Sequence, residues 1–126
     1  MDDSLGRLYD QVIAAKTADP ALSRTAKLMR SGRAKMAKKL AEEAIEVVID
    51  AMNGETEAVV RESADLLYNL VVLWAAAGVR PQDVFAEMAR RERLFGLAEK
   101  VPKKHVETSA RRKVVLLEVR RKSRRR

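Results

Sequence analysis

The sequence EEAIEVVIDAMNGETEAVVRESAD, residues 42–65, places four carboxylates symmetrically about Gly54. These carboxylates are Glu43, Glu46, Glu62 and Asp65. The first two precede the glycine by eleven and eight residues, and the last two follow it by eight and eleven residues. Each pair has i,i+3 spacing, so both of its members share one face of a helix. Because Asn-Gly is a chain-reversal signal, we expect two antiparallel helices that bring the two pairs opposite each other.

This hairpin would crowd the acids at close range. In an antiparallel pair Glu46 lies level with Glu62, and Glu43 lies level with Asp65. A rise of about 1.5 Å per residue separates the two levels by only ~4.5 Å. Two like charges about 4 Å apart repel by roughly 4 kcal/mol at an effective dielectric of about 20, so the four acids need a cation among them. Hard carboxylate oxygens favour Mg²⁺, with Mn²⁺ as the alternative, over zinc.

The alternative interpretation of these acids is a solvated helix face. The ion pairs available there are Lys38–Glu42 and Lys39–Glu43, which have the i,i+4 spacing of ordinary surface pairs. Most charge runs on helices are of this kind and contribute little. The metal site is favoured because the acids stand in stripes bordered by apolar residues such as Val47 and align with a second pair across the turn. Buried or half-buried acids without basic partners are costly, and metal coordination in a helical bundle relieves that cost.

A basic stretch precedes the acids. Residues 20–41 contain seven Lys or Arg and no acid. Lys39 and Asn69 are equidistant from Gly54, so we expect them to lie opposite each other beside the metal. This combination fits a polyphosphate, because a metal bridges phosphate oxygens while cations neutralise the rest. The substrate-binding candidates are Lys39, Asn69, Lys27 and Lys35. For the lysines other than Lys39, a solubilising surface is the alternative.

Turn and cap signals predict further helices on both sides of the hairpin. We expect five helices, over about 4–16, from the N-cap Ser23 through Met29, over about 33–52, over about 55–77 with Gly78 as C-cap, and from Pro81 to about Phe95. Hydrophobic residues make up 47% of the chain and aromatic residues 4%, which is typical of an all-helical protein. The predicted fold class is therefore all-α, a bundle of four to five helices with the site on the antiparallel hairpin.

Charge divides the chain into a domain and a tail. Of the net charge of +8, residues 103–126 contribute +9 and residues 1–102 contribute −1. We therefore expect an all-α domain over residues 1–100 and a basic tail over 101–126, flexible or loosely docked. Such a tail attracts polyanions in a salt-sensitive way, so nucleic acid is predicted to be a weak partner at most.

Composition also excludes several classes of protein. The chain has no Cys and one His, which rules out disulfides, thiolate metal sites and sites with two imidazoles. Its N-terminus lacks a signal-peptide pattern, and the longest apolar run, residues 70–77, is far shorter than the ~20 residues of a membrane span. We expect a cytoplasmic protein without a membrane partner. The helices over 33–52 and 55–77 are apolar almost all round, which predicts a homodimer or larger homo-oligomer.

Several motifs resemble those of a known family. Residues 42–46 and 62–65 match E-E-x-x-E and E-x-x-D, the pattern of the MazG-like all-α nucleoside triphosphate pyrophosphatases. Within that superfamily the chain is most similar to the phosphoribosyl-ATP pyrophosphohydrolases of histidine biosynthesis. Their S-W-T-x-K-L, K-K-x-x-E-E-x-x-E-V-V and E-x-A-D-L-L-Y-H-L-x-V-L motifs resemble residues 23–28, 38–48 and 62–73.

The resemblance implies a fold of the all-α NTP pyrophosphatase type that cleaves phosphoribosyl-ATP between its α and β phosphates, giving phosphoribosyl-AMP and pyrophosphate. It implies Mg²⁺ held by the four acids named above, Glu43, Glu46, Glu62 and Asp65, with a metal-activated water as nucleophile. Glu42 is the candidate base or water-orienting group, because it is the one acid of the cluster that is not needed as a ligand.

Three features depart from the family pattern. Asn69 stands where the family usually has His, Arg24 replaces a Trp, and the basic tail has no counterpart. Asn keeps a donor and an acceptor but cannot take a proton. One alternative is therefore a housekeeping nucleoside triphosphate pyrophosphatase of the same superfamily. The other is a non-catalytic helical protein that binds nucleic acid through its tail, and the presence of all four carboxylates argues against it.

Overall fold

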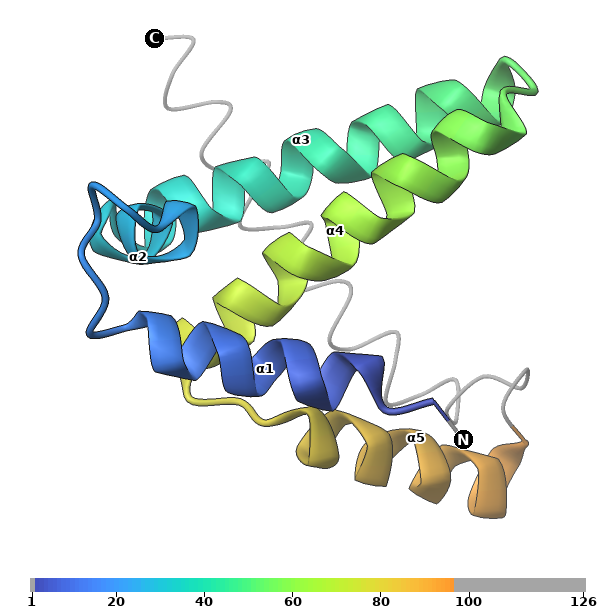
Figure 1. The fold of residues 1–126 in the computed structure, drawn as a ribbon. Helices are drawn as coiled ribbons and strands as arrows, with labels where there is room; N and C mark the ends of the chain where they lie inside the picture. Colours follow the sequence, from blue (N-terminus) through green and yellow to red (C-terminus); the bar gives the residue numbers. More distant parts are fainter. Residues whose placement is uncertain (1, 97–126) are drawn as a thin grey trace, which may run out of the picture. The chain divides into compact units, whose positions relative to one another are not determined.

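Residues 2–96, which this computed structural model describes, contain five α-helices and no strand (Figure 1). The helices are α1 Ser4–Ala15, α2 Arg24–Arg30, α3 Arg33–Met52, α4 Thr56–Ala77 and α5 Pro81–Phe95. The all-α fold class is confirmed, and every helix end lies within one residue of its predicted position. The predicted basic tail, residues 101–126, lies outside the described residues.

The turn between α3 and α4 is built by Gly54. Its φ of 70° is in the left-handed region, where a residue without Cβ is favoured. The Gly54 amide donates to the carbonyl of Ala51 at 3.1 Å, and the Glu55 amide donates to that of Asp50 at 3.0 Å. These are the two bonds of a Schellman motif, which satisfies the last carbonyls of α3 and reverses the chain. The local sequence alone therefore forms the turn of the hairpin.

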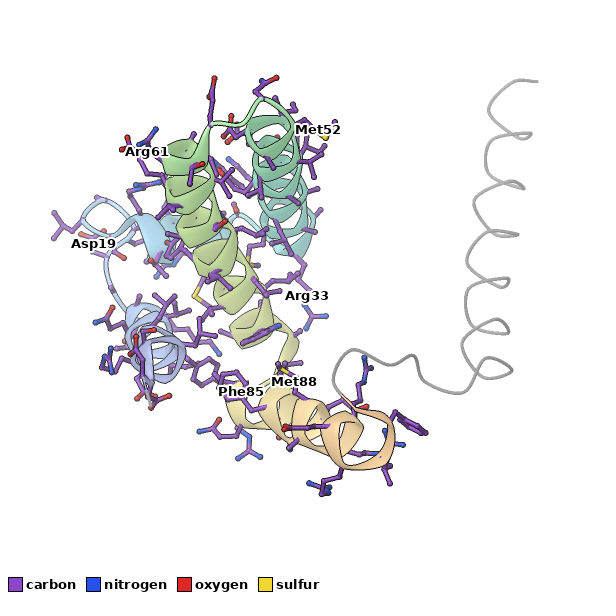
Figure 2. The ribbon with its side chains drawn as sticks, turned by 90° about the vertical axis from the view of Figure 1, so that its right-hand side faces the viewer. Asp19, Arg33, Met52, Arg61, Phe85 and Met88 are labelled. Carbon is purple, nitrogen blue, oxygen red and sulfur yellow. The ribbon has the colours of Figure 1, made fainter. Side chains whose placement is uncertain are left out.

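The two hairpin helices lie antiparallel along their length and make the most extensive helix contact of the fold (Figure 1). Met52 lies at the turn, and Arg33 lies at the other end of α3 (Figure 2). There Arg33 Nη2 donates to the carbonyl of Ala76 at 2.9 Å, near the end of α4. The hairpin is thus fixed at its turn and at its open end, which sets the register of the acids between them.

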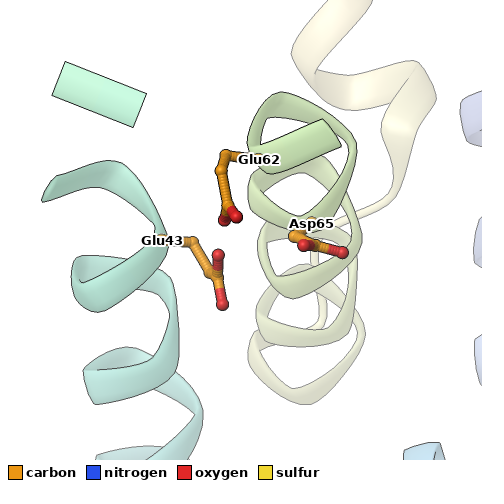
Figure 3. A group of neighbouring side chains, drawn as sticks. All are labelled: Glu43, Glu62 and Asp65. Carbon is orange, nitrogen blue, oxygen red and sulfur yellow. The ribbon is translucent and has the colours of Figure 1, made fainter. Parts of the chain in front are cut away.

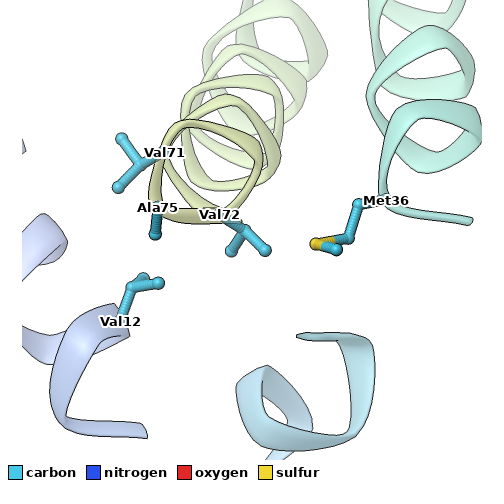
Figure 4. Close-up of a cluster of buried hydrophobic side chains, with 5 residues drawn as sticks. All are labelled: Val12, Met36, Val71, Val72 and Ala75. Atoms are coloured by element: carbon cyan, nitrogen blue, oxygen red, sulfur yellow. The ribbon is translucent and has the colours of Figure 1, made fainter. Parts of the chain in front are cut away.

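The hydrophobic core lies on the later half of α4. Its buried residues are Val12 from α1, Met36 from α3, and Val71, Val72 and Ala75 from α4 (Figure 4). The short helix α2 adds Ala26, which is 1% exposed, and is capped by Ser23, whose hydroxyl accepts the Ala26 amide at 3.1 Å. The half of the hairpin nearer Gly54 lies outside this core.

The described part of the chain divides into two units, and the boundary falls within α5, between Val84 and Phe85. At the start of α5, Asp83 accepts bonds from the backbone amide and the guanidinium of Arg80. In the second unit, Glu87 pairs with Arg90 and Arg91, each at 3.1 Å. Such surface pairs on one helix contribute little to stability. Among the helices described, none is long and apolar enough to cross a membrane.

Gly78 offers a direct test of how α4 ends. Its φ is 75°, and a Cβ added there meets nothing within 4 Å, so Gly78→Ala changes only the backbone preference. We expect the free energy of unfolding to fall by about 1–2 kcal/mol, the cost of a left-handed alanine. Urea denaturation measures it, with Gly78→Asn as the control, because Asn adopts this conformation more readily. An alanine variant as stable as the wild type would contradict this assignment of the cap.

Candidate active site

Three carboxylates meet across the hairpin. Glu43 on α3 and Glu62 and Asp65 on α4 each offer one carboxylate oxygen, and these oxygens lie within 4.8 Å of one another (Figure 3). Glu43 and Glu62 are half-buried, whereas Asp65 is exposed. The register set by the turn at Gly54 therefore brings Glu43 of α3 beside Glu62 and Asp65 of α4.

Glu46 lies at the edge of this cluster. It is exposed and is not one of the three residues whose oxygens lie within 4.8 Å of one another. It is nevertheless close to Glu62, since a hydrogen bond with Glu62 and the charge of that carboxylate raise the pKa of Glu46. Glu46 thus interacts with both Glu62 and Glu43. The structure brings together three of the four predicted ligands and places the fourth next to them.

Crowding affects the protonation of these acids. The pKa of Glu62 is raised, first by a hydrogen bond with Glu43 and further by partial burial and the charges of Glu43 and Asp65. Because neighbouring carboxylates repel one another, Glu46 and Glu62 each give up their proton less readily than an isolated glutamic acid does. The described side chains supply no cation within the cluster that relieves this repulsion.

One atom of the cluster supports metal binding directly. Glu43 Oε2 is buried and has no hydrogen-bond partner among the described residues. A buried carboxylate oxygen without a partner is costly. A divalent cation would satisfy that oxygen and neutralise the surrounding acids at the same time. The donor set consists of hard oxygens, which fits Mg²⁺ or Mn²⁺.

A cavity of about 440 Å³ adjoins the acid cluster. Its wall is formed by Arg24, Lys27, Leu28, Ser31, Lys35, Lys39, Glu43, Asp65, Tyr68 and Asn69. Two members of the acid cluster and all four predicted substrate-binding residues are among them. The volume is in the range of small-ligand sites. The wall of the cavity thus contains both carboxylates and cations.

Asn69 and Tyr68 shape the α4 wall of the cavity. Asn69 is 5% exposed, and its Nδ2 donates to the carbonyl of Asp65 at 2.8 Å. The hydroxyl of Tyr68 lies 2.6 Å from Oγ1 of Thr25, a hydrogen bond that joins α4 to α2. The short helix α2 carries Arg24. This bond therefore helps to hold that cation near the acids of α4.

Tyr68, Ser31 and Arg24 also line the cavity. From the sequence we expected no role at the site for them. A signal for Tyr68 was available, since it follows Asp65 by three residues and so shares its helix face. No comparable signal marked Ser31, which lies in the connection between α2 and α3.

Glu42 lies outside both the cluster and the cavity wall. Its carboxylate is exposed and lies 4.0 Å from Nζ of Lys38, which is the surface pair that the alternative interpretation expected. The other pair of that interpretation, Lys39–Glu43, is not formed among the described side chains, and both residues line the cavity instead. The base role of Glu42 stays a prediction, and this geometry does not favour it.

Comparison with known protein sequences identifies the family of this chain. The sequence pattern of the phosphoribosyl-ATP pyrophosphohydrolases matches residues 5–92. The chain belongs to the phosphoribosyl-ATP pyrophosphohydrolase family. It is 71% identical over 106 residues to phosphoribosyl-ATP pyrophosphatase 2 of Rhodopseudomonas palustris, covering 84% of this chain and 81% of that protein. It is 64% identical over 126 residues to phosphoribosyl-ATP pyrophosphatase 2 of Bradyrhizobium diazoefficiens, covering 94% of each.

A phosphoribosyl-ATP pyrophosphatase of Azospirillum brasilense is 53% identical over 100 residues, covering 79% of this chain and 90% of that protein. The predicted family and the predicted enzyme class, a hydrolase, are confirmed. The match to the phosphoribosyl-ATP pyrophosphohydrolase pattern ends at Glu92, on α5. The basic tail predicted over residues 101–126 lies beyond this match. The expectation that the tail has no counterpart is nevertheless wrong, because the Bradyrhizobium diazoefficiens relative covers 94% of the chain and so includes a counterpart of at least part of the tail.

The crowded carboxyls predict how stability depends on pH. The pKa values of Glu46 and Glu62 in the folded protein are raised above the ordinary value of 4.5. At pH values between 4.5 and the raised pKa, the folded state therefore binds more protons than the unfolded state. The free energy of unfolding contributed by these groups therefore falls as pH rises through that window. We expect metal-free protein to gain stability from them as pH is lowered from neutral toward the ordinary pKa of 4.5, and Glu62→Gln to lose most of this gain.

Urea denaturation in EDTA at several pH values measures this effect, with Glu92→Gln as a control that leaves the cluster intact. Asp83 and Glu87 do not interfere, because bonds from Arg80 and from Arg91 lower their pKa values, so their stabilising effect is lost only at more acidic pH. With Mg²⁺ present the slope should reverse, because protons then compete with the metal. The same pH profile in wild type and Glu62→Gln would contradict the prediction.

Proposed function

We propose that this chain hydrolyses phosphoribosyl-ATP to phosphoribosyl-AMP and pyrophosphate, with Mg²⁺ as cofactor, as a step of histidine biosynthesis in the cytoplasm. The observation that carries the proposal is that Glu43 and Asp65 belong both to the acid cluster and to the wall of the cation-lined cavity. Relatives that are 64% and 71% identical bear the name of this activity, which supports it.

Glu43, Glu62 and Asp65 would hold the ion, and Glu46 would add a fourth carboxylate. Bound Mg²⁺ would polarise the phosphate and lower the pKa of its water, and Mn²⁺ could replace it. The support is the partnerless buried oxygen of Glu43 and the all-carboxylate donor set.

The residues of the cavity would bind the triphosphate. Lys39 and Lys35 lie on the same face of α3, four residues apart, and both line the cavity with Glu43. Their charges would orient the phosphates and stabilise the departing pyrophosphate, whose negative charge increases as the bond breaks. Asn69, held by its bond to Asp65, can exchange hydrogen bonds with the substrate but cannot take its proton.

A matched set of amide variants tests the site. We expect Glu43→Gln and Glu62→Gln to lower kcat/KM by at least about 100-fold, because each removes a ligand charge at the reacting phosphate. Glu42→Gln should stay within a few-fold of wild type, because Glu42 pairs with Lys38 on the surface. Release of pyrophosphate from phosphoribosyl-ATP with Mg²⁺ is the measurement, and thermal melts check folding. Near-normal turnover by Glu43→Gln would overturn the metal site.

The position of Asn69 keeps a second candidate function open. It lines the cavity at the position where the family usually has His, and unlike His it cannot take a proton. This difference would alter the choice of substrate. A housekeeping pyrophosphatase acting on other nucleoside triphosphates is therefore the alternative, and turnover of dCTP or dUTP beside phosphoribosyl-ATP distinguishes the two. The nucleic-acid-binding alternative depends on tail residues outside the described part of the chain and stays a prediction.

We also propose that two copies of the chain associate through the turn half of the hairpin. Large apolar side chains are exposed there, and they are Ile45, Val48, Ile49 and Met52 on α3 and Val60 and Leu67 on α4. The four on α3 have i, i+3, i+4, i+7 spacing and form one stripe. Their exposed fractions reach 83% at Met52. A contiguous apolar patch of this kind marks an association surface, and a second hairpin would cover it in a four-helix arrangement.

A charge in that stripe tests the assembly. We expect Ile49→Asp to convert a dimer into a monomer at micromolar concentration, because a carboxylate cannot be buried there without a partner. Sedimentation velocity measures the state, and Gln11→Asp, at an exposed position of α1, serves as the control. A wild-type protein that is folded, active and monomeric at the same concentration would refute the proposal.

A further inference from the structure

We propose that a second cavity beside the first binds the phosphate of the phosphoribosyl group, at the opposite end of the substrate from the triphosphate. This inference rests on the proposed function. The second cavity has a volume of about 460 Å³, and its wall is formed by Pro20, Ala21, Leu22, Ser23, Arg24 and Lys27. It shares Arg24 and Lys27 with the cavity at the acid cluster.

The two shared residues are cations that can serve both cavities. Arg24 and Lys27 are three residues apart on α2 and so lie on one face of that helix. Both are exposed, and neither forms an ion pair with another described residue. Guanidinium and ammonium groups form charge-assisted bonds with phosphate oxygens. Their charge is therefore available to an anionic ligand on either side.

The nearest acid in the sequence does not form part of the second cavity's wall. Asp19 lies in the loop between α1 and α2, but its Oδ1 accepts the backbone amide of Ala21 at 2.9 Å. The backbone carbonyl of Asp19 also accepts the amides of Leu22 and Ser23, at 2.9 and 3.0 Å. These bonds order the loop that forms the wall. The wall thus combines two cations with apolar side chains from Pro20 to Leu22.

This wall matches one end of phosphoribosyl-ATP. The substrate carries a triphosphate on one ribose and a single phosphate on the other, with the adenine between them. An ordinary nucleoside triphosphate lacks the second phosphate. With the triphosphate at the acid cluster, the adjoining cavity offers cations for the remaining phosphate and apolar surface for its sugar. The second cavity would therefore distinguish phosphoribosyl-ATP from ATP.

Ala21 allows a test that leaves the shared cations untouched, because it lines only the second cavity. We expect Ala21→Glu to lower the affinity for phosphoribosyl-ATP relative to ATP by about tenfold, since a like charge opposes the phosphate. Ala21→Gln, of equal size and no charge, should keep the wild-type ratio. KM for phosphoribosyl-ATP and the inhibition constant of ATP give this ratio, and ribose 5-phosphate should inhibit Ala21→Glu less than wild type.

The outcomes separate this inference from the function on which it rests. If the wild type releases no pyrophosphate from phosphoribosyl-ATP, the proposed function fails and the inference fails with it. If the wild type is active but Ala21→Glu and Ala21→Gln change both ligands equally, only the inference is overturned. Equal inhibition of wild type and Ala21→Glu by ribose 5-phosphate would also overturn it.

Discussion

The repulsion between Glu43 and Glu62 across the α3–α4 hairpin is the constraint on which the rest of the site depends. Neither acid has a basic partner among the described residues, and one oxygen of Glu43 is buried without a hydrogen bond. The fold nevertheless holds the acids together, because the turn at Gly54 and the bond from Arg33 to Ala76 fix both ends of the hairpin. The hairpin thus preorganises a set of charges that only a cation can neutralise fully.

Stability and function occupy different halves of α4. Its later half carries the buried residues Val71, Val72 and Ala75, which pack against α1 and the start of α3. Its earlier half carries Glu62 and Asp65 of the acid cluster and the exposed Val60. Placing the core away from the acids lets the protein tolerate a destabilising cluster, since the energy of the core does not depend on it. The hydrogen bond between Thr25 of α2 and Tyr68 of α4 holds the cations of α2 near the acids.

Much of this could be predicted from the sequence, because the decisive signals are local. Ser23, Gly54 and Gly78 fix helix ends through hydrogen bonds within a few residues, and helical rise alone aligns the acids. Other features depend on contacts that no local pattern records. The position of Glu46 beside the three-residue cluster depends on side-chain rotamers, and the place of Arg24 between two cavities depends on how the loop before α2 folds.

Above all, we propose that the acid cluster is a metal site. Isothermal titration calorimetry of Mg²⁺ into metal-free protein tests it most directly, in two buffers with different ionisation enthalpies at about pH 6. We expect saturable binding with release of protons, because ligation requires ionised carboxylates and the pKa values of Glu46 and Glu62 are raised. Binding to Glu43→Gln should be much weaker. The absence of saturable binding, or binding that Glu43→Gln leaves unchanged, would contradict the proposal.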